Sequence, residues 1–226
     1  MAVRSTVVHG YDRLAPLYDR LAALYSGGRI GACHDTIAAR LTPGDEVLFV
    51  GAGSGRDAAA AAQRGIRPTL VDLSPRMLSR AARRFEPTGI SPTLVSGDIR
   101  AFDPTHGAVP PRRFDAVVTC FFLNVFGSDE LPALIEHLVS LVRPGGRLWI
   151  ADFAPPRGTR LARITQRLYH DLPMHTFRAL TGNAIHSIHE IAPALERAGI
   201  VVRERTALRI FRFGPRWLEV IEGAAP

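Results

Sequence analysis

Short, β-rich apolar runs alternate along this chain with longer stretches whose composition favours helix. The runs predict strands, and the stretches between them predict helices that cross from one parallel strand to the next. The pattern therefore indicates an α/β fold built on a mostly parallel sheet. The first five strands are expected at 46–50, 69–71, 93–95, 114–119 and 147–151.

Helices are expected between and around these strands. An alanine-rich helix is predicted over 57–64, a second over 75–85 with Ser74 as its N-cap, and a third over about 129–142 that a Pro-Gly-Gly segment ends. We expect one domain, consisting of an N-terminal helical cover, a core, a helical lid and C-terminal strands. The bounds of these four parts are 1–41, 45–154, 155–199 and 200–226, and the last strands are expected at 200–205, 208–213 and 217–221.

The chain is basic, and arginine alone supplies the positive charge. Its 226 residues include 28 arginines, no lysine and 21 acidic residues, so the formal net charge is 28 − 21 = +7. Without lysine the chain cannot use Schiff-base chemistry or a P-loop lysine. Membranes, nucleic acids and anionic ligands all remain open as partners.

Neither a membrane span nor a structural disulfide is expected. The longest uncharged stretch, 116–128, is far shorter than a span requires, and the N-terminus lacks the apolar core of an export signal. Cys33 and Cys120 lie far apart and form no CxxC pair. We therefore expect a cytoplasmic protein without a metal site.

Three alternating glycines and two acidic residues follow the first three expected strands. Gly51, Gly53 and Gly55 allow a sharp turn and a close approach of a ligand to the backbone. Ligands bind at the carboxyl ends of parallel strands, so the glycines should share one crevice with Asp72 and Asp98. There the first aspartate could accept both hydroxyls of a ribose and the second an adenine amine. The alternative is a tight turn and two turn-capping aspartates.

Five motifs, in order over 45–150, resemble those of the class I S-adenosylmethionine-dependent methyltransferases. The motifs are LFVGAGSG, LVDLSPRML, LVSGDI, FDAVVTCFFLNVF and LVRPGGRLWIADF. The resemblance implies a Rossmann-like, seven-stranded, mostly parallel sheet with helices on both faces, a helical lid and S-adenosyl-L-methionine as cofactor. The segment 11–19 is similar to the YDxxAxxYD segment of ubiquinone/menaquinone-type methyltransferases, in which an aromatic residue covers the cofactor.

The same resemblance implies the residues that hold the cofactor. The glycine loop would lie under the methionine end, Asp72 would bind the ribose, and the adenine would lie between Leu73 and Met77. Cys120 and Phe121 would lie beside the sulfonium. The complete set implied by the resemblance is Tyr11, Tyr18, Gly51, Ala52, Gly53, Gly55, Asp72, Leu73, Met77, Asp98, Ile99, Cys120 and Phe121.

One position departs from the family pattern. The family usually has an acidic residue two positions before the first glycine, where this chain has Phe49. The methionine ammonium therefore loses a nearby negative charge, which predicts weaker cofactor binding or a reaction other than methyl transfer.

Three other functions share part of the pattern. A nicotinamide-binding domain would need a third glycine where Arg56 stands. Amino-group methyltransferases of nucleic acids usually carry [DN]PP[YF] after the fourth strand, where residues 120–124 read CFFLN, so nucleic acid is not the expected partner. The arginine excess nevertheless keeps an RNA methyltransferase as an alternative. A non-catalytic S-adenosylmethionine-binding protein is another, prompted by Phe49 and by the lack of an unambiguous base.

Methyl transfer from a sulfonium depends mainly on alignment and desolvation, and a general base helps only when the acceptor holds its proton tightly. We expect His186, His189 and Tyr18 to be the catalytic candidates. The two histidines stand three residues apart and could share a helical face, although each could instead cap, pack or face solvent. Further candidates are His170, Asp171, His175, Glu190 and Asn124.

Aromatic residues after the fourth strand suggest what the acceptor is, although core packing is the plainer explanation for any single one of them. They predict a pocket for a small, uncharged ring or lipid-like acceptor, such as a quinone precursor. A lipid-like acceptor would bring peripheral contact with a membrane. The aromatic residues considered for this pocket are Phe121, Phe122, Phe126, Phe153, Tyr169 and Phe177.

Overall fold

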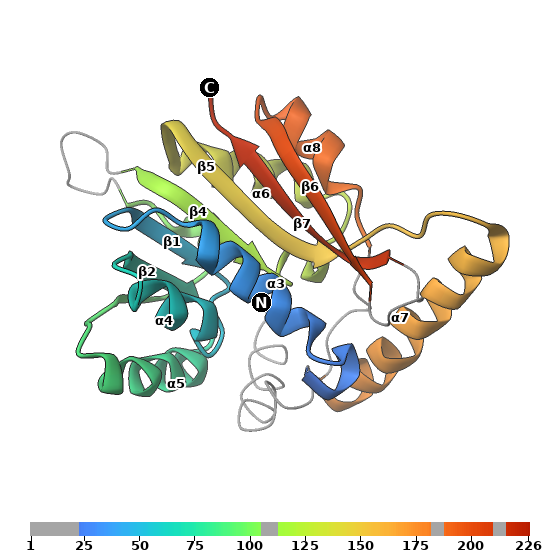
Figure 1. Cartoon of the computed structure of the whole chain (residues 1–226), viewed down its shortest axis with the longest axis horizontal. Helices are drawn as coiled ribbons and strands as arrows, with labels where there is room; N and C mark the ends of the chain where they lie inside the picture. The colour runs from blue at the N-terminus through green and yellow to red at the C-terminus, as the bar shows by residue number, and fades with distance from the viewer. Residues whose placement is uncertain (1–22, 105–112, 182–187, 210–215) are drawn as a thin grey trace.

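Seven strands form one sheet in the order β3-β2-β1-β4-β5-β7-β6 (Figure 1). This computed structural model describes residues 23–104, 113–181, 188–209 and 216–226. The strands are β1 (Glu46–Val50), β2 (Arg67–Asp72), β3 (Thr93–Ser96), β4 (Phe114–Cys120), β5 (Val142–Phe153), β6 (Val201–Arg209) and β7 (Arg216–Ala224). The α-helices that lie entirely within these residues are α3 (Arg29–Arg40), α4 (Arg56–Ala62), α5 (Pro75–Phe85), α6 (Leu131–Ser140), α7 (Arg160–Thr181) and α8 (Ile191–Arg197).

The sheet is parallel except at one strand. β1 to β5 pair in parallel, and β7 runs antiparallel to both β5 and β6. The predicted seven-stranded, mostly parallel α/β sheet is therefore confirmed. A reversed strand inserted between β5 and β6 also interrupts the 3-2-1-4-5-6 order of dinucleotide-binding domains, which argues against the dehydrogenase alternative.

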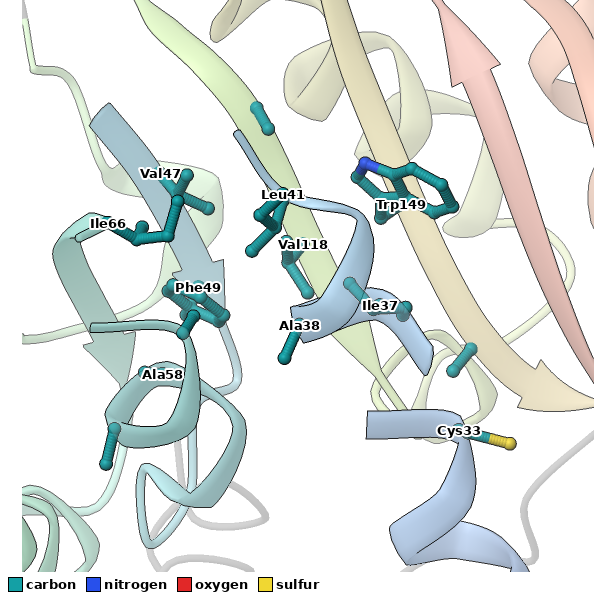
Figure 2. Close-up of a cluster of buried hydrophobic side chains, with 14 of the residues drawn as sticks. Cys33, Ile37, Ala38, Leu41, Val47, Phe49, Ala58, Ile66, Val118 and Trp149 are labelled. Carbon is teal, nitrogen blue, oxygen red and sulfur yellow. The ribbon is translucent and has the colours of Figure 1, made fainter. Parts of the chain in front are cut away.

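The two faces of the sheet bury separate apolar layers. On β1, Val47 and Phe49 pack with residues of α3, α4 and α5, whereas Leu48 and Val50 pack with α6 and α8. Figure 2 shows Phe49 in the first layer, close to Ala58 of α4. The side chain at the position where the family usually has an acid is thus part of the core, with 1% of its surface exposed.

The sequence predicted the start of one helix correctly but not the start of one strand. α5 begins as expected, because the Ser74 hydroxyl accepts a hydrogen bond from the Met77 amide at 3.1 Å and Pro75 occupies the first turn. β5 is longer than the expected 147–151, because the Pro-Gly-Gly segment forms an irregularity within the strand instead of preceding it. A Cβ at Gly146 would lie 2.8 Å from the Asp115 carbonyl oxygen, so only glycine permits this pairing.

Two tyrosines join the start of the described chain to α7. The Tyr25 hydroxyl donates to the Tyr169 carbonyl at 3.1 Å, and the Tyr169 hydroxyl donates to the Tyr25 carbonyl. Their rings stack at 5.4 Å, and both meet Trp217 of β7 edge-on at 4.9 Å. This reciprocal pair anchors α7 beside the carboxyl end of β5. None of the helices within the described ranges is long and apolar enough to cross a membrane.

Candidate functional site

The loop after β1 has the backbone that its glycines were expected to provide. Gly51, Gly53 and Gly55 all have positive φ, at 61°, 52° and 67°. A Cβ at Gly51 would lie 2.3 Å from the Phe122 ring. A Cβ at Gly55 would lie 2.8 Å from the Cβ of Ala81. No atom lies within 4 Å of a Cβ built on Gly53. Of the three, Gly53 therefore presents its backbone to open space, as a ligand would require.

Asp72, the last residue of β2, holds this loop in place. Its two carboxylate oxygens accept hydrogen bonds from the Gly53 amide at 2.7 Å and from the Ser74 amide at 2.8 Å. Charge-assisted bonds of this kind are stronger than neutral ones. The second expected strand end and the glycine loop thus meet, and Asp72 remains partly exposed.

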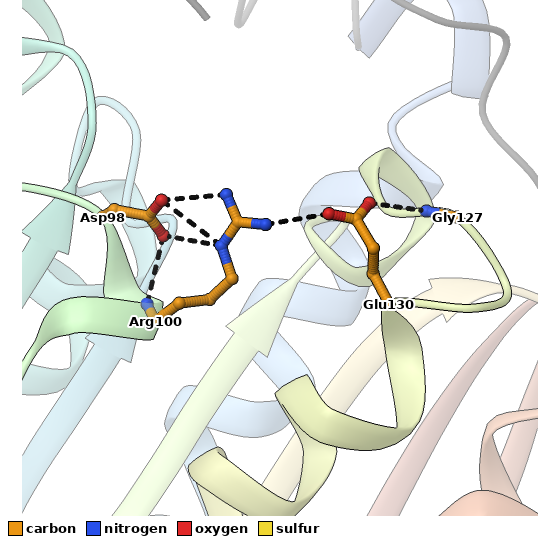
Figure 3. A network of polar contacts seen from close by, with 4 residues as sticks. All are labelled: Asp98, Arg100, Gly127 and Glu130. Atoms are coloured by element: carbon orange, nitrogen blue, oxygen red, sulfur yellow. Dashed lines mark hydrogen bonds and ion pairs between the residues drawn. The ribbon is translucent and has the colours of Figure 1, made fainter. Parts of the chain in front are cut away.

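Asp98, after β3, is already paired. The Arg100 guanidinium binds its carboxylate through Nε at 3.0 Å and Nη2 at 2.8 Å, and reaches Glu130 through Nη1 at 2.8 Å (Figure 3). The Gly127 amide donates to the second oxygen of Glu130. An adenine amine would therefore share the Asp98 carboxylate with Arg100, a partner that the sequence analysis did not anticipate.

The carboxyl end of β4 carries a strained residue. Phe121 has φ 53°, the one positive value outside glycine among the described residues. Its amide donates to the Ala151 carbonyl at 2.7 Å, which ties the turn to β5. Its ring meets Phe153 edge-on at 5.5 Å and lies 6.0 Å from the His34 ring. The aromatic residues expected near the fourth strand are thus divided between the two layers, with Phe121 and Phe153 in one and Phe122 and Phe126 in the other.

A partly buried polar cluster that includes Cys120 was not predicted from the sequence. His34 of α3, Asp57 of α4 and Cys120 place their donor atoms within 4.8 Å of one another, with His34 Nδ1 3.2 Å from an Asp57 oxygen. Burial opposes ionisation of Asp57, but His34 and the hydrogen bonds from Ala58 and the Cys120 thiol outweigh it and keep the pKa of this carboxyl below its usual value. Such a set of donor atoms can surround a cation, and the lowered pKa favours the ionised form of the Asp57 carboxyl.

The Cys120 thiol itself stays protonated. Burial, followed by the nearby Asp57 and Cys33, raises the pKa of Cys120 well above its usual value. A thiol in this state is a weak nucleophile. The side chain therefore contributes packing and a hydrogen bond at this end of β4.

A second buried carboxylate lies at the end of β5. Asp152 is 2% exposed and accepts the Asn124 side-chain amide at 2.7 Å, the Asn124 backbone amide at 3.2 Å and the Phe153 amide at 2.8 Å. Burial raises the pKa of Asp152 to about 6 despite these bonds, and the charge of Glu219 adds to the rise. Asn124, one of the expected catalytic candidates, is thus engaged in holding this carboxylate.

The remaining expected cofactor contacts differ in exposure. Leu73 is 42% exposed, whereas Met77 and Ile99 are both 3% exposed and belong to the core. Ala52 lies in the glycine loop and donates its amide to the Val71 carbonyl. Tyr11 and Tyr18 fall outside the described residues.

The expected candidates from the lid are dispersed. His189 is buried and its Nε2 donates to the Phe126 carbonyl at 2.9 Å, so the loop after β4 holds it. His170 is buried against Phe153, and its Nδ1 lies 2.9 Å from Asp171. His175 is exposed, and Glu190 pairs on the surface with two arginines. His186 lies outside the described residues.

Comparison with known proteins identifies the family. Residues 47–146 match the methyltransferase domain family. Demethylmenaquinone methyltransferase of Tropheryma whipplei is 31% identical over 180 residues, which cover 72% of this chain and 68% of that protein. The chain belongs to the class I S-adenosylmethionine-dependent methyltransferases. Their cofactor, S-adenosylmethionine, is therefore the cofactor of this enzyme.

Two other relatives define the range of the similarity. The aclacinomycin 10-hydroxylase RdmB of Streptomyces purpurascens is 32% identical over 166 residues, covering 71% of this chain and 41% of that protein. The second relative is the magnesium protoporphyrin IX methyltransferase of Synechocystis, solved with bound S-adenosylhomocysteine. It superimposes with a TM-score of 0.65 at 21% identity, and the match covers 88% of this methyltransferase and 84% of that chain. The structural match supports the fold assigned above.

The open space at Gly53 leads to a prediction. Gly53→Ala should lower the affinity of the methyltransferase for S-adenosylmethionine about tenfold, because the new methyl group would occupy space over the loop. Gly89→Ala is the matched control, since Gly89 has φ 68° and equally open surroundings but lies after α5. Both variants should lose about 1 kcal/mol of stability from the left-handed backbone alone. Titration calorimetry and thermal unfolding measure the two effects, and unchanged affinity in Gly53→Ala would contradict the prediction.

Proposed function

We propose that this methyltransferase transfers a methyl group to a small, uncharged, ring-bearing acceptor of quinone-like or lipid-like character. The observation that carries the proposal is the edge-on contact of Phe121 with Phe153 where β4 and β5 end. Phe122 and Phe126 form a second edge-on pair, which packs with the other layer of the core. Aromatic walls favour a flat apolar ligand over a charged one. The 31% identity to a demethylmenaquinone methyltransferase supports the same class of acceptor.

Asp72 and Gly53 form the proposed centre of the cofactor site. The carboxylate accepts hydrogen bonds from two backbone amides of this region, and its oxygens are the proposed acceptors for the hydroxyl groups of a ribose. The Gly53 backbone leaves room for a ligand over the loop. The bound cofactor supplies an electrophilic methyl group on a sulfonium, whose leaving group is already activated.

Asp57 is proposed to replace the acid that the family usually carries at the position of Phe49. Both residues belong to the layer of α3 and α4, and Asp57 adjoins Cys120, the residue expected beside the sulfonium. Its charge would act on the methionine end through the Cys120 side chain. In general, two unit charges separated by about 7 Å interact by about 2 kcal/mol at an effective dielectric constant of about 20.

The proposed contribution of the protein to catalysis is alignment and exclusion of water. The strained turn at Phe121 fixes one wall of the site, and the Phe121 amide bond to Ala151 prevents its relaxation. A general base remains a prediction, with His186, His189 and Tyr18 as first candidates. His34 joins them, because its ring lies 6.0 Å from that of Phe121 and its Nδ1 lies 3.2 Å from an Asp57 oxygen.

The reaction is tested with radiolabelled S-adenosylmethionine and a panel of acceptors. A naphthoquinol, a simple phenol and transfer RNA separate the proposed acceptor class from the nucleic-acid alternative, and transfer to the naphthoquinol is expected. Mass spectrometry of the product distinguishes an added methylene from an added oxygen, which a hydroxylase would introduce. Label in RNA alone, or tight cofactor binding without transfer to any small molecule of a cell extract, would overturn the proposal.

The proposed charge of Asp57 gives a separate prediction. Asp57→Asn should weaken S-adenosylmethionine binding about 30-fold and weaken binding of the uncharged-sulfur product S-adenosylhomocysteine less, because the product lacks the sulfonium charge. Asp115→Asn is the control, since Asp115 lies at the amino end of β4, opposite the site. Calorimetric titration of both ligands decides the question. An equal loss for both ligands, or no loss, would exclude a role for this charge at the sulfonium.

A further inference from the structure

One side of α7 is apolar and uncovered. Leu161, Ile164 and Leu168 are 71%, 47% and 64% exposed, and their spacing places them in one stripe along the helix. Gln166 and Tyr169, on another side, bind the body of the protein through the Ala154 and Tyr25 carbonyls. α7 is thus fixed along one side and presents its leucines and isoleucine outward.

Arginines line one edge of this stripe. Arg160, Arg163 and Arg167 repeat at spacings of three and four, so they share a helical face next to the apolar one, and all three are exposed. No acidic residue occurs from Phe153 to His170, and no ion pair joins the three arginines to another described residue. Figure 1 shows α7 standing at the side of the molecule, beyond the edge of the sheet.

This combination selects among possible occupants. A second copy of the chain, docked by two-fold symmetry on the same stripe, would bring two rows of arginine together without acidic partners in the segment. An anionic lipid surface offers phosphate groups to the arginines and acyl chains to the leucines at once. We propose that the α7 stripe, defined as Leu161, Ile164 and Leu168 with its arginine row, binds the surface of anionic membranes.

The proposed contact is interfacial. Because none of the described helices can span a bilayer, α7 would lie in the headgroup region with its axis along the surface. The opposite side of α7 would keep its contacts with Ala154 and Tyr25, so binding needs no unfolding of the anchored side. The proposal depends on these surface residues alone and holds for any acceptor.

Vesicle cosedimentation tests the proposal with the full chain and without cofactor or acceptor. Vesicles containing phosphatidylglycerol should bind the protein at low salt, and pure phosphatidylcholine vesicles should bind it at least about tenfold less. Leu161→Gln/Leu168→Gln should reduce binding to the anionic vesicles about tenfold. Arg163→Gln/Arg167→Gln should do the same and should weaken the salt dependence.

Matched variants separate this surface from the general basic charge of the chain. Leu94→Gln/Val201→Gln removes two exposed apolar side chains elsewhere, and Arg83→Gln/Arg203→Gln removes the same charge elsewhere, so both should bind like the unsubstituted protein. Equal losses in α7 and control variants would overturn the proposal. So would failure of the unsubstituted protein to bind either vesicle, or dimers in light scattering that only the α7 substitutions dissociate. Circular dichroism checks that every variant is folded.

Discussion

Asp72→Ala is expected to lower the affinity for S-adenosylmethionine by at least about 100-fold, the largest effect of any single substitution at this site. The carboxylate accepts the Gly53 amide at 2.7 Å and the Ser74 amide at 2.8 Å, so its loss releases the glycine loop and the start of α5 together. Its proposed bonds to the ribose disappear as well. A hydrogen bond to a charged group is worth about 1.5–3 kcal/mol. The loss of two such bonds between the ribose hydroxyls and the Asp72 carboxylate therefore accounts for the predicted loss of affinity.

The controls for Asp72 separate binding from folding. Asp72→Asn keeps one acceptor oxygen and should recover part of the affinity, whereas Asp115→Ala, at the other end of the sheet, should bind the cofactor normally. Titration calorimetry gives the affinities, and thermal unfolding without ligand gives the cost in stability. If Asp72→Ala is folded and binds the cofactor as tightly as the unsubstituted protein, the placement of the cofactor across this loop is wrong.

Asp152 should make the stability of the protein fall as pH rises from about 4 to about 6. Burial raises its pKa to about 6 from an ordinary value of 3.8, so between these values the folded state holds a proton that the unfolded state has lost. The contribution of protonated Asp152 to the free energy of unfolding is therefore complete below about pH 4, and it is lost as the pH rises through about 6. Asp152→Asn stays neutral, so its stability relative to the unsubstituted protein should increase by about 3 kcal/mol between pH 4 and pH 7.

Urea unfolding at several pH values measures this difference. Asp115→Asn provides a control of opposite sign, because the Glu46 amide and Arg143 lower the pKa of Asp115 despite its partial burial. The Asp115 carboxylate stabilises the fold above its unfolded pKa and loses that effect as pH falls, so its variant should lose stability relative to the unsubstituted protein as pH rises. Parallel pH profiles for the unsubstituted protein and Asp152→Asn would contradict the assignment.

The parts of the fold that follow from local chemistry were predictable. β1 has the predicted bounds, because its five residues lie between a turn and the glycine loop. Successive side chains of this strand pack with opposite layers of the core. α5 begins where Ser74 and Pro75 indicate a cap. The Asp72 contact with the loop was anticipated because parallel strands deliver their carboxyl ends to one edge, whatever their separation in sequence.

The parts that depend on packing between distant helices were not predictable. His34 meets Asp57 only because α3 packs on α4, and no motif links the two positions. One signal was available: Asp57 precedes five consecutive alanines, and a charged residue at the start of so apolar a helix calls for a buried partner. Arg100 was likewise missed as the partner of Asp98, because their contact follows from a short turn after β3.

The two β6 segments expected at 200–205 and 208–213 illustrate a different limit. Within the described residues they form one strand, Val201–Arg209, whose pairing with β7 shifts register twice. The sequence shows polar residues in this region and therefore a break in the alternation. The structure accommodates these residues at the sheet edge, where one side of the strand faces solvent.

The reciprocal bonds between Tyr25 and Tyr169 have a consequence for how the protein opens. Each hydroxyl donates to the other residue's carbonyl, so separating the two segments would break both hydrogen bonds in one event. Partial detachment gains nothing, because the stacked rings and Trp217 would lose contact at the same time. Amide protons near Tyr25 and around Tyr169 in α7 should therefore exchange with solvent at a common rate, as one cooperative unit.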